Sequence, residues 1–390
     1  MQEKILIVSN YFPPETGAAP NRIATLAQGL QEKGWDVSVL CPLPNYPNGK
    51  VLPEYQGKIK HYSSEGGLHI FRTWIYPSIS KNKVVRLFSM LSFSFSMSLF
   101  LVFKKTPKKI IIQSPPLFVA FFAVLICRLK SKKIILNVSD LWPLAGKELG
   151  VMKEGFSYKL LERIEKFNYK NAHLILGQSE EICEHISHKV KTKSILYRNY
   201  PKFTIDKNLS STTTDKIHII YAGLLGVAQG IVELCEKISI PENIVFDIYG
   251  NGAEKLELIE FIKKNPKINI LYHGELTRTE LHQVLAEKAD YAIIPLVNRI
   301  YGSVPSKIFE MANMGLPVIY MGGGEGELIV NEFELGKVVN PTDYNALNKL
   351  LSNISKTSIQ TKETITTTAK ENFSFDRQLI LLDSAIKAVN

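Results

Sequence analysis

The sequence predicts an α/β protein built from two doubly wound, Rossmann-like domains that face each other across a cleft. Two observations lead to this fold class. Short apolar segments typical of buried strands alternate with segments of helical spacing along almost all of the 390 residues, and this alternation indicates parallel sheets covered by helices. One polar, Ser/Thr-rich segment at 199–215 interrupts the alternation, and we interpret it as the linker between the domains.

The first domain, placed at 1–200, begins with an apolar strand followed by a helix. The helix is expected at 20–33, where Ile23, Leu26 and Leu30 share one face and Gly34 ends the pattern. The strands of this domain are predicted at KILIVS, DVSVL, KIIIQ, KKIILNVSD and AHLILGQS. A Pro-rich loop, CPLPNYPNG, follows the second of these strands.

The alternation restarts after the linker and gives a second domain at 216–372. Its strands are predicted at IHIIYAG, IVFDIYG, INILYHG, YAIIPL, LPVIYM and GKVVN. A capping box formed by Thr277 and Glu280 opens the helix between the third and fourth of them. The segment 373–390 has apolar residues at helical spacing and is expected to form a final helix.

The net charge of +10 is concentrated in one segment of the chain. No Asp or Glu occurs between Gly66 and Ser139, although this span contains twelve basic residues. They are Arg72, Lys81, Lys83, Arg86, Lys104, Lys105, Lys108, Lys109, Arg128, Lys130, Lys132 and Lys133. A positive field of this kind attracts anionic membranes, phosphates or nucleic acid.

Apolar runs in the same segment decide between these partners. Leu87–Phe103 holds seventeen uncharged residues, five of them serines, and 115–127 is similarly apolar. Nucleic-acid patches interleave basic and aromatic residues on a polar surface, so we expect no nucleic-acid partner. We expect instead that the surface around 84–103 lies on an anionic membrane. The alternatives are buried core helices with solvated lysines at their ends and, less favoured because of the serines, a membrane span.

Cysteine usage and the first residues suggest a compartment. The four cysteines are far apart and form no CxxC pair, which indicates reduced thiols rather than a disulfide framework or a zinc site. The opening MQEKILIVSNYFPPE lacks the charged-then-apolar pattern of a signal peptide. We therefore expect a cytoplasmic protein that is bound peripherally to the inner face of the cytoplasmic membrane.

Glycine turns follow several of the predicted strands. Gly17 follows the first strand. Gly223 ends IHIIYAG and Gly226 follows it, and Gly250 ends IVFDIYG. The segment GGGEGE follows LPVIYM. A glycine turn that opens a helix presents backbone N–H groups to an anion, although glycine at such turns is more often required by geometry alone. Together they indicate a phosphate-containing ligand, but none matches GxGxxG or the P-loop.

The segment SVPSKIFEMANMGLPVI, residues 303–319, places a lysine at the start of a helix. If Ser306 is the N-cap, Lys307 is the first helical residue, where the helix dipole disfavours a cation. The position becomes favourable if a phosphate binds there, because the ammonium, the backbone N–H groups and the dipole then converge on it. Glu310, one turn later, could accept hydrogen bonds from ribose hydroxyls. The alternative is an exposed lysine in an i,i+3 ion pair with Glu310.

A family resemblance rests on four motifs in order. They are FPPETGAAPNR at 12–22, PNYPNG at 44–49, DLWP at 140–143 and PSKxxExAxxGxPVI at 305–319. With them the chain resembles the family 4 retaining glycosyltransferases, and within that family the WbuB-like and colanic-acid-type enzymes of bacterial surface-polysaccharide synthesis. The resemblance implies the GT-B fold, with the donor nucleotide on the C-terminal domain and the acceptor on the N-terminal one. It also implies that the helix at 373–390 packs back on the N-terminal domain.

The resemblance assigns roles to individual residues. It implies that Lys307, together with Ser306, binds the donor diphosphate and that Glu310 is the second glutamate of a paired motif that holds the ribose. It places Gly17, Gly223, Gly226 and Gly250 in the donor-binding turns. The chain departs from the family in three regions. Gly302 replaces the first glutamate, and Leu144 stands where an acidic residue is frequent. The arginine and lysine that are common after the GxL turn are also missing, with Gln229 at the position of the lysine. Lys307 therefore carries more of the phosphate charge, with help from Arg299.

These residues suggest a reaction that needs no metal or other cofactor. The chain contains no DxD pair, and a lysine at a helix terminus can stabilise a leaving diphosphate electrostatically. Relatives of this type are thought to deliver the acceptor on the face that the leaving group departs from, so that no protein nucleophile is required. Asp140 is the candidate for orienting the acceptor hydroxyl, and it forms the expected catalytic set with Lys307 and Glu310. The alternative is that Asp140 is a helix-capping or loop carboxylate.

The expected activity is transfer of a sugar, of hexosyl or N-acetylhexosaminyl type, from a nucleotide sugar to a lipid-linked or saccharide acceptor. By resemblance the nucleotide is UDP, the acceptor a polyprenyl-diphosphate-linked sugar or an oligosaccharide, and the pathway an O-antigen, lipopolysaccharide or capsule synthesis. The alternatives are a GT-B nucleotide-sugar 2-epimerase, a nicotinamide-dependent oxidoreductase and a non-catalytic nucleotide-binding partner. The sugar, the acceptor, the linkage and the oligomeric state stay open.

Overall fold

The computed structural model describes residues 2–46, 49–78, 80, 82–202 and 215–389. The chain divides into two compact units. The N-terminal unit comprises Met1–Asn199 and Asp376–Asn390, and the C-terminal unit comprises Tyr200–Phe375. Most of the expected linker, together with Pro47 and Asn48 of the PNYPNG motif and the basic residue Lys81, lies outside the described residues.

The described part of the N-terminal unit contains one sheet with the strand order β3-β4-β2-β1-β5-β6-β7-β8. All neighbouring strands are parallel except β3, which pairs antiparallel with β4 at the edge. The strands are β1 Lys4–Val8, β2 Asp36–Pro42, β3 Lys60–Glu65, β4 Leu68–Thr73, β5 Lys109–Ser114, β6 Lys133–Val138, β7 Leu174–Gly177 and β8 Ser194–Leu196.

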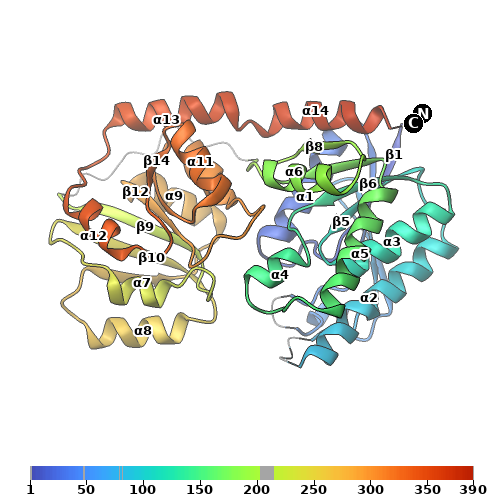
Figure 1. Ribbon diagram of the computed structural model, residues 1–390, viewed down its shortest axis with the longest axis horizontal. Coiled ribbons are helices and arrows are strands. Elements are labelled where there is room, and N and C mark those ends of the chain that lie inside the picture. Colours follow the sequence, from blue (N-terminus) through green and yellow to red (C-terminus); the bar gives the residue numbers. More distant parts are fainter. Residues whose placement is uncertain (1, 47–48, 79, 81, 203–214, 390) are drawn as a thin grey trace. The chain divides into compact units, whose positions relative to one another are not determined.

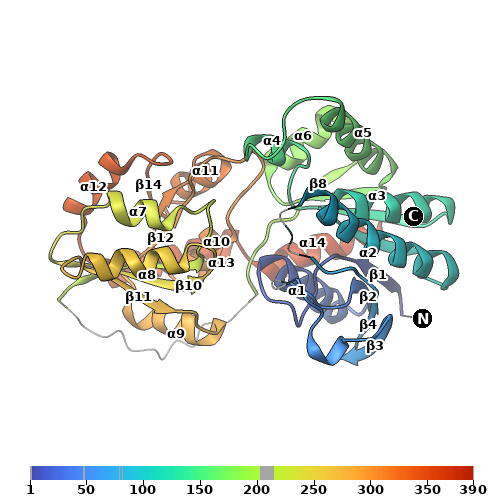
Figure 2. The ribbon, with the colours of Figure 1, turned by 90° about the horizontal axis from the view of Figure 1, so that it is seen from below.

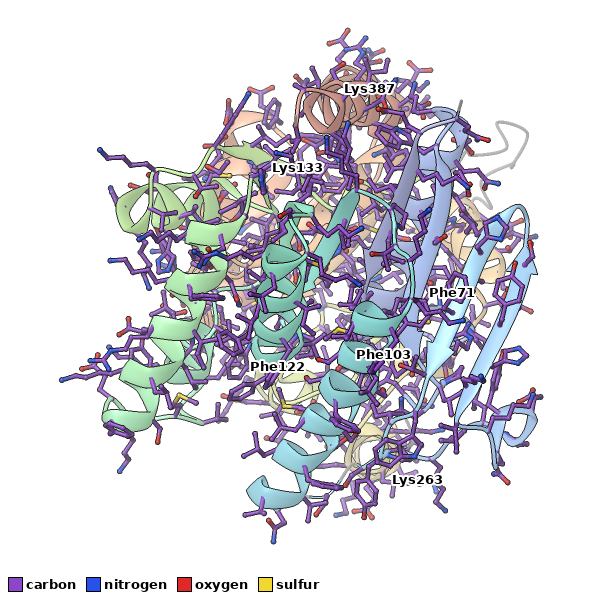
Figure 3. All side chains as sticks on the ribbon, turned by 90° about the vertical axis from the view of Figure 1, so that its right-hand side faces the viewer. Phe71, Phe103, Phe122, Lys133, Lys263 and Lys387 are labelled. Carbon is purple, nitrogen blue, oxygen red and sulfur yellow. The ribbon has the colours of Figure 1, made fainter. Side chains whose placement is uncertain are left out.

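Helices cover both faces of this sheet, because the strand order reverses at β1 and right-handed crossovers then place successive helices on opposite faces. Figure 3 shows α2, α3 and α5 side by side on one face. The helices are α1 Ala18–Glu32, α2 Lys83–Phe103, α3 Leu117–Leu129, α4 Leu144–Glu148, α5 Phe156–Asn171, α6 Glu180–Lys189 and α14 Phe375–Lys387, with a 3-10 turn at Pro53–Tyr55.

The last helix, α14, is held on the N-terminal unit by side-chain hydrogen bonds. Trp35 Nε1 donates to Asp383 Oδ1 over 2.7 Å. The Gln378 amide accepts from the Arg198 backbone N–H at 2.8 Å and donates to the Arg198 carbonyl at 2.9 Å. The final segment of the sequence thus contributes a helix to the first unit, as Figure 1 shows.

The described part of the C-terminal unit contains a fully parallel sheet with the order β11-β10-β9-β12-β13-β14. In chain order this is 3-2-1-4-5-6, the arrangement of a dinucleotide-binding Rossmann sheet. The strands are β9 Ile217–Leu224, β10 Ile244–Asn251, β11 Ile270–Gly274, β12 Tyr291–Pro295, β13 Val318–Met321 and β14 Gly336–Val338. The helices are α7 Ile231–Lys237, α8 Lys255–Lys264, α9 Arg278–Lys288, α10 Ser306–Asn313, α11 Gly324–Glu332, α12 Tyr344–Ser352 and α13 Ile359–Asn372.

Alternate residues of the strands divide the C-terminal unit into two cores. Ile219 and Tyr221 of β9 pack with α7, α8 and α12, whereas Ile220 and Ala222 pack with α9, α10, α11 and α13. Figure 1 shows α7 and α8 on one side of the sheet and α11 on the other, and Figure 2 shows α7 and α8 in front of the strands. Burial of both faces explains the continuous apolar strand segments of the sequence.

These observations confirm the predicted fold class, two Rossmann-like α/β domains with parallel sheets. Every predicted strand segment forms a strand, and the predicted capping box at Thr277 is present. The β3–β4 hairpin was not predicted. Its edge strand, Lys60–Glu65, has the polar sequence KHYSSE and is mostly exposed, so it lacks the apolar segment by which the other strands were recognised.

Helix α2 buries two of its serines together with Phe93, Met97 and Leu101, and carries its other large apolar side chains on its outer side. Ser92 and Ser94 are buried, and their hydroxyls donate to the carbonyls of Ser89 and Met90 at 2.6 and 3.0 Å. Such back-bonding satisfies a serine inside a helix. The outer side carries an apolar stripe with exposed fractions between 42% and 79%. It consists of Val84, Leu87, Phe88, Phe95, Leu99, Val102 and Phe103.

The basic residues of the segment between Gly66 and Ser139 do not all lie at this surface. Arg72 is 1% exposed and donates to the Pro13 carbonyl, and Lys109 is held between Glu3 and the Trp35 ring. Both are corrections to the expected basic surface. The Lys130 ammonium bonds two carbonyls at the end of α2, at 2.8 and 2.7 Å. Among the described residues, no helix combines the length and apolar character needed to cross a membrane.

Candidate functional site

The candidate donor site lies in the C-terminal unit where the strand order reverses, between β9 and β12. Ligands of doubly wound sheets bind beyond the carboxyl ends of strands at this point. Gly223 near the end of β9 pairs with Gly250 near the end of β10. A Cβ atom on Gly250 would lie 1.8 Å from the Gly223 carbonyl oxygen, and the φ angle of Gly250 is +141°. Only glycine permits this approach, which leaves the ends of both strands accessible as bare backbone.

Helix α10 follows β12 and begins one residue earlier than expected. Pro305 is the N-cap, with φ −62° and ψ 121°, and no side chain caps the helix. The prediction that Ser306 is the N-cap is therefore wrong, because the fixed φ of Pro305 suits the extended conformation of the cap residue. Ser306 becomes the first helical residue and Lys307 the second. Glu310 still lies one turn inside the helix.

Lys307 reaches from α10 across the end of β9. Its Cε lies 3.3 Å from the position that a Cβ atom on Gly223 would take. Tyr221, whose hydroxyl donates to the Leu224 carbonyl at 2.5 Å, supports the same turn. The lysine side chain thus passes directly over the glycine turn of β9.

Glu310 is contacted by basic side chains from two helices. Its Oε1 lies 2.9 Å from His282 Nε2 and 3.9 Å from Arg278 Nε, both on α9. Its Oε2 lies 3.5 Å from Lys307 Nζ. Burial alone would raise the pKa of Glu310, but Lys307, the His282 hydrogen bond and Arg278 outweigh it and lower the pKa to about 2. The Lys307–Glu310 pair that was weighed as an alternative therefore exists, but as one contact within a larger cluster.

The other predicted residues of this site surround the same sheet end. Gly226 follows β9, and a Cβ atom on it would meet Gln229 Oε1 at 3.0 Å. That oxygen is buried and has no hydrogen-bond partner among the described residues. Arg299 lies over the glycine turn before α11, with Nε 2.9 Å from the position of a Cβ atom on Gly324. Arg299 thus lies beside the GGGEGE turn.

In the N-terminal unit, the loop after β1 is fixed by a buried carboxylate. Glu15 accepts backbone N–H groups of Phe12, Asn45 and Tyr46 at 3.4, 2.8 and 2.9 Å. It thereby ties the loop to the Pro-rich segment after β2, and burial raises its pKa. Gly17 ends the loop with φ +125° as the N-cap of α1, a conformation that favours glycine.

Asp140 lies just after β6 in a polar cluster. Ser139 Oγ donates to its Oδ2 at 3.2 Å. Arg22 of α1 donates through Nη1 to Gln178 Oε1, while its buried Nε has no partner among the described residues. Burial raises the pKa of Asp140, and the charge of Arg22 and the Ser139 hydroxyl lower it in part. This carboxylate is therefore more basic than an exposed aspartate.

Several residues of these sites were missed in the sequence. His282 and Arg278 are spaced i,i+4 on a helix whose start was recognised, but nothing in that spacing indicates Glu310 as their partner. Glu15 and Arg22 lie inside a motif that was recognised, but nothing in their spacing indicates a partner. Among the described residues, no group of three or more His, Cys, Asp or Glu side chains could hold a metal ion.

Two family profiles match the chain. Residues 17–190 match the glycosyl transferase 4-like domain, and residues 203–371 match the glycosyl transferases group 1 domain. Together they span most of both units. Neither describes a nucleotide-sugar 2-epimerase or an oxidoreductase, so these alternatives are not favoured. No sequence among the curated proteins matches significantly.

Solved structures share the fold over the whole chain at low identity. Sucrose-phosphate synthase from Thermosynechococcus elongatus is 14% identical with a TM-score of 0.73, covering 99% of this chain and 98% of that one. The lipopolysaccharide outer core galactosyltransferase WaaB in its apo form is 15% identical with a TM-score of 0.65 and 99% coverage of both chains. Anabaena HepE in complex with UDP is 13% identical with a TM-score of 0.65 and full coverage of both.

Proposed function

Because the chain belongs to the glycosyltransferases that join a glycosyl transferase 4-like domain to a group 1 domain, we propose that it transfers a sugar from a nucleotide sugar with retention of configuration. The expected acceptor is a polyprenyl-diphosphate-linked sugar or an oligosaccharide, as in the WbuB-like and colanic-acid-type enzymes. The pathway would then be the synthesis of an O-antigen, lipopolysaccharide or capsule. The donor nucleotide is expected to be UDP, in keeping with the UDP and UDP-glucose complexes of the similarly folded HepE.

The position of Lys307 carries this proposal. The lysine lies in the first turn of α10, and its side chain passes over Gly223 at the switch point of the sheet. A diphosphate bound there would meet the ammonium, the free N–H groups of the helix terminus and the bare backbone of β9 and β10 together. A cation at a helix N-terminus is otherwise unfavourable, so an anionic ligand explains its presence.

The chemistry follows from where charge develops. The acceptor oxygen forms a bond to the anomeric carbon on the face from which the leaving group departs, and the bond from that carbon to the diphosphate oxygen breaks. The acceptor proton passes to the leaving phosphate. Lys307 and the terminus of α10 stabilise the negative charge that appears on the diphosphate. Glu310 would hold the ribose, Ser306 and Arg299 would assist on the diphosphate side, and Asp140 would orient the acceptor hydroxyl. No metal is required in this scheme.

The test replaces Lys307 by methionine, which keeps the length of the side chain and removes its charge. Loss of one preorganised donor typically costs about 2.7–4 kcal/mol of transition-state stabilisation, roughly a 10²–10³-fold loss of kcat. The Lys307–Glu310 pair alone would contribute only a few tenths of a kcal/mol to stability. Lys349→Met, on the exposed side of α12, is the matched control.

Turnover would be measured with membranes and labelled UDP-, GDP- and ADP-sugars, which also identifies the donor. Nucleotide affinity would be measured by calorimetry. A Lys307→Met protein with unchanged affinity for the nucleotide and unchanged turnover would refute the proposal. A wild-type protein stabilised by NAD but by none of the nucleotide sugars would refute it as well.

The apolar stripe of α2 supports a membrane-bound acceptor. Water-facing helices of globular proteins carry polar residues outward, whereas the outer side of α2 exposes Phe88, Phe95 and Phe103. The exposed lysines Lys104 and Lys105 follow directly. An apolar stripe with adjacent cations is typical of a surface that enters the headgroup region of an anionic membrane. We propose that the protein works in the cytoplasm at the inner face of the cytoplasmic membrane.

Vesicle flotation tests this part separately. Phe95→Ser/Leu99→Ser should reduce binding to vesicles of phosphatidylcholine and phosphatidylglycerol roughly tenfold or more, because two partly exposed apolar side chains no longer enter the membrane. The control is Ile380→Ser/Leu381→Ser on α14, where both side chains are also exposed. Wild-type protein that ignores anionic vesicles would contradict the membrane surface while leaving the donor chemistry intact.

A further inference from the structure

The two oxygens of the Glu310 carboxylate have different partners. His282 and Arg278 of α9 approach Oε1, and Lys307 of α10 approaches Oε2. Because an ionised carboxylate can only accept hydrogen bonds, His282 Nε2 carries the proton of the 2.9 Å contact. One oxygen is thus held by a neighbouring helix, while the other faces the lysine assigned to the diphosphate.

The contact with His282 is the shortest and best shielded of the three. The His282 and Glu310 side chains are 18% and 15% exposed, whereas Arg278 is 47% exposed and 3.9 Å away. An exposed pair at that distance is weakened by solvent and salt. The orientation of Glu310 therefore depends mainly on His282.

Helix α9 is itself fixed at both ends, so it offers His282 a rigid base. Its start is closed by the capping box of Thr277 and Glu280. Near its end, Leu285 is fully buried in the core and the Lys288 ammonium bonds the buried Asp247 at 2.8 Å. A group that must hold a functional carboxylate in place is most effective on such an element.

We propose that His282 is a positioning residue of the donor site. Held through Oε1 by His282, the Glu310 carboxylate keeps Oε2 directed toward the ligand side, ready to accept a ribose hydroxyl. Lys307 can leave Oε2 and turn to the diphosphate, and Glu310 then keeps its orientation because its anchor lies on another helix. This inference rests on the proposed use of a nucleotide donor and adds a residue that no feature of the sequence assigned.

The experiment compares nucleotides with and without ribose hydroxyls. The affinities of UDP and 2′,3′-dideoxy-UDP would be measured by calorimetry for the wild-type protein and for His282→Leu, His282→Gln and Glu310→Gln. Glutamine can donate from a nitrogen close to the histidine Nε2 position, so His282→Gln tests the hydrogen bond itself. Gln283→Leu, an exposed neighbour on α9, is the matched control for helix stability.

His282→Leu should weaken UDP binding by roughly tenfold, the order expected when a flexible side chain loses its fixed orientation, and should leave dideoxy-UDP binding nearly unchanged. The protein would thus no longer bind UDP more tightly than dideoxy-UDP, and KM for the donor would increase by a larger factor than kcat decreases. His282→Gln would restore most of the preference for UDP. In the Glu310→Gln background, His282→Leu should add little, because both act on the same contact.

Two results would overturn the inference. One is a His282→Leu protein that prefers UDP over its dideoxy analogue as strongly as the wild-type does. The other is a His282→Gln protein that fails as completely as His282→Leu, since the ring rather than the hydrogen bond would then matter. Failure of the proposed function is distinguishable, because the wild-type protein itself would then bind neither nucleotide.

Discussion

Asp247, in the middle of β10, allows a quantitative test of how the C-terminal unit is held together. It is fully buried, and three side chains donate to its carboxylate. His273 Nε2 and Lys288 Nζ bond Oδ1 at 2.6 and 2.8 Å, and His218 Nδ1 bonds Oδ2 at 2.7 Å. The donors come from β9, β11 and α9, so one carboxylate joins four elements. The substitution Asp247→Asn keeps the shape and removes the charge.

The expected loss follows from the pKa. Burial would raise the pKa of Asp247, but the hydrogen bonds from His273, Lys288 and His218 outweigh it and lower the pKa from 3.8 to about 2. A pKa unit corresponds to about 1.4 kcal/mol, so the ionised form contributes about 2 kcal/mol of stability at neutral pH. Removing one partner of a buried ion pair costs about 3–5 kcal/mol, because the other charge stays behind. We expect Asp247→Asn to lower the free energy of unfolding by about 2–5 kcal/mol.

Urea unfolding of the full chain can separate the two units. All three tryptophans, Trp35, Trp74 and Trp142, belong to the N-terminal unit, so their fluorescence reports that unit. Far-UV circular dichroism reports both. The substitution should destabilise the transition seen only by circular dichroism and leave the fluorescence transition unchanged. Glu260→Gln, which removes an exposed ion pair with Lys264, should change stability by no more than a few tenths of a kcal/mol.

The pH dependence has a defined sign. The pKa of Asp247 is lower in the folded protein than in the unfolded chain, so its contribution is complete above about pH 5 and is lost as the pH falls toward 2. The difference between wild type and Asp247→Asn should therefore shrink by about half between pH 7 and pH 3. A difference below about 0.5 kcal/mol at pH 7, or one independent of pH, would refute the reasoning.

Two further predictions concern the site itself. Gly250→Ala should destabilise the C-terminal unit in circular-dichroism melting more than Gly274→Ala, because both have positive φ but only Gly250 lies against the Gly223 carbonyl; equal losses would contradict the close approach. Arg22→Leu should move the acid limb of the pH–rate profile to higher pH, because it removes a charge that lowers the pKa of Asp140. An unchanged limb would show that Asp140 does not govern it.

Much of the fold could be predicted from the sequence because the signal is local. Strands covered on both faces, such as IHIIYAG and IVFDIYG, are continuous apolar segments, and each became a strand of the central sheet. The edge strand Lys60–Glu65 has no such segment. The orientation of α2 could not be predicted from the sequence either, because the sequence shows serines among apolar residues but not which side of the helix faces the sheet. Back-bonding in the helix makes burial of Ser92 and Ser94 acceptable.

Residues of the candidate site could be singled out from the sequence where one residue type is out of place, and could not where the partner is distant in sequence. Lys307 attracts notice because a cation at a helix start is unfavourable without an anion. His282 is an ordinary polar residue of an exposed helix until the fold brings it 2.9 Å from Glu310, twenty-eight positions later. The same holds for Asp247, whose partners His218, His273 and Lys288 are separated by whole elements.

Gly302 occupies the position at which the family pattern implies a second glutamate beside Glu310. The family pattern implies a carboxylate at this position, yet Gly302 is buried and has φ +84°, a left-handed conformation that other residues adopt only at a cost of about 1–2 kcal/mol. We expect Gly302→Glu to lower stability by that amount without improving nucleotide affinity. Gly302→Ala has the same backbone cost but adds no carboxylate. The difference in UDP affinity between the two variants therefore reports the effect of the carboxylate alone. If Gly302→Glu bound UDP more tightly than Gly302→Ala, a second glutamate would be useful here, and the assignment of the ribose to Glu310 alone would be wrong.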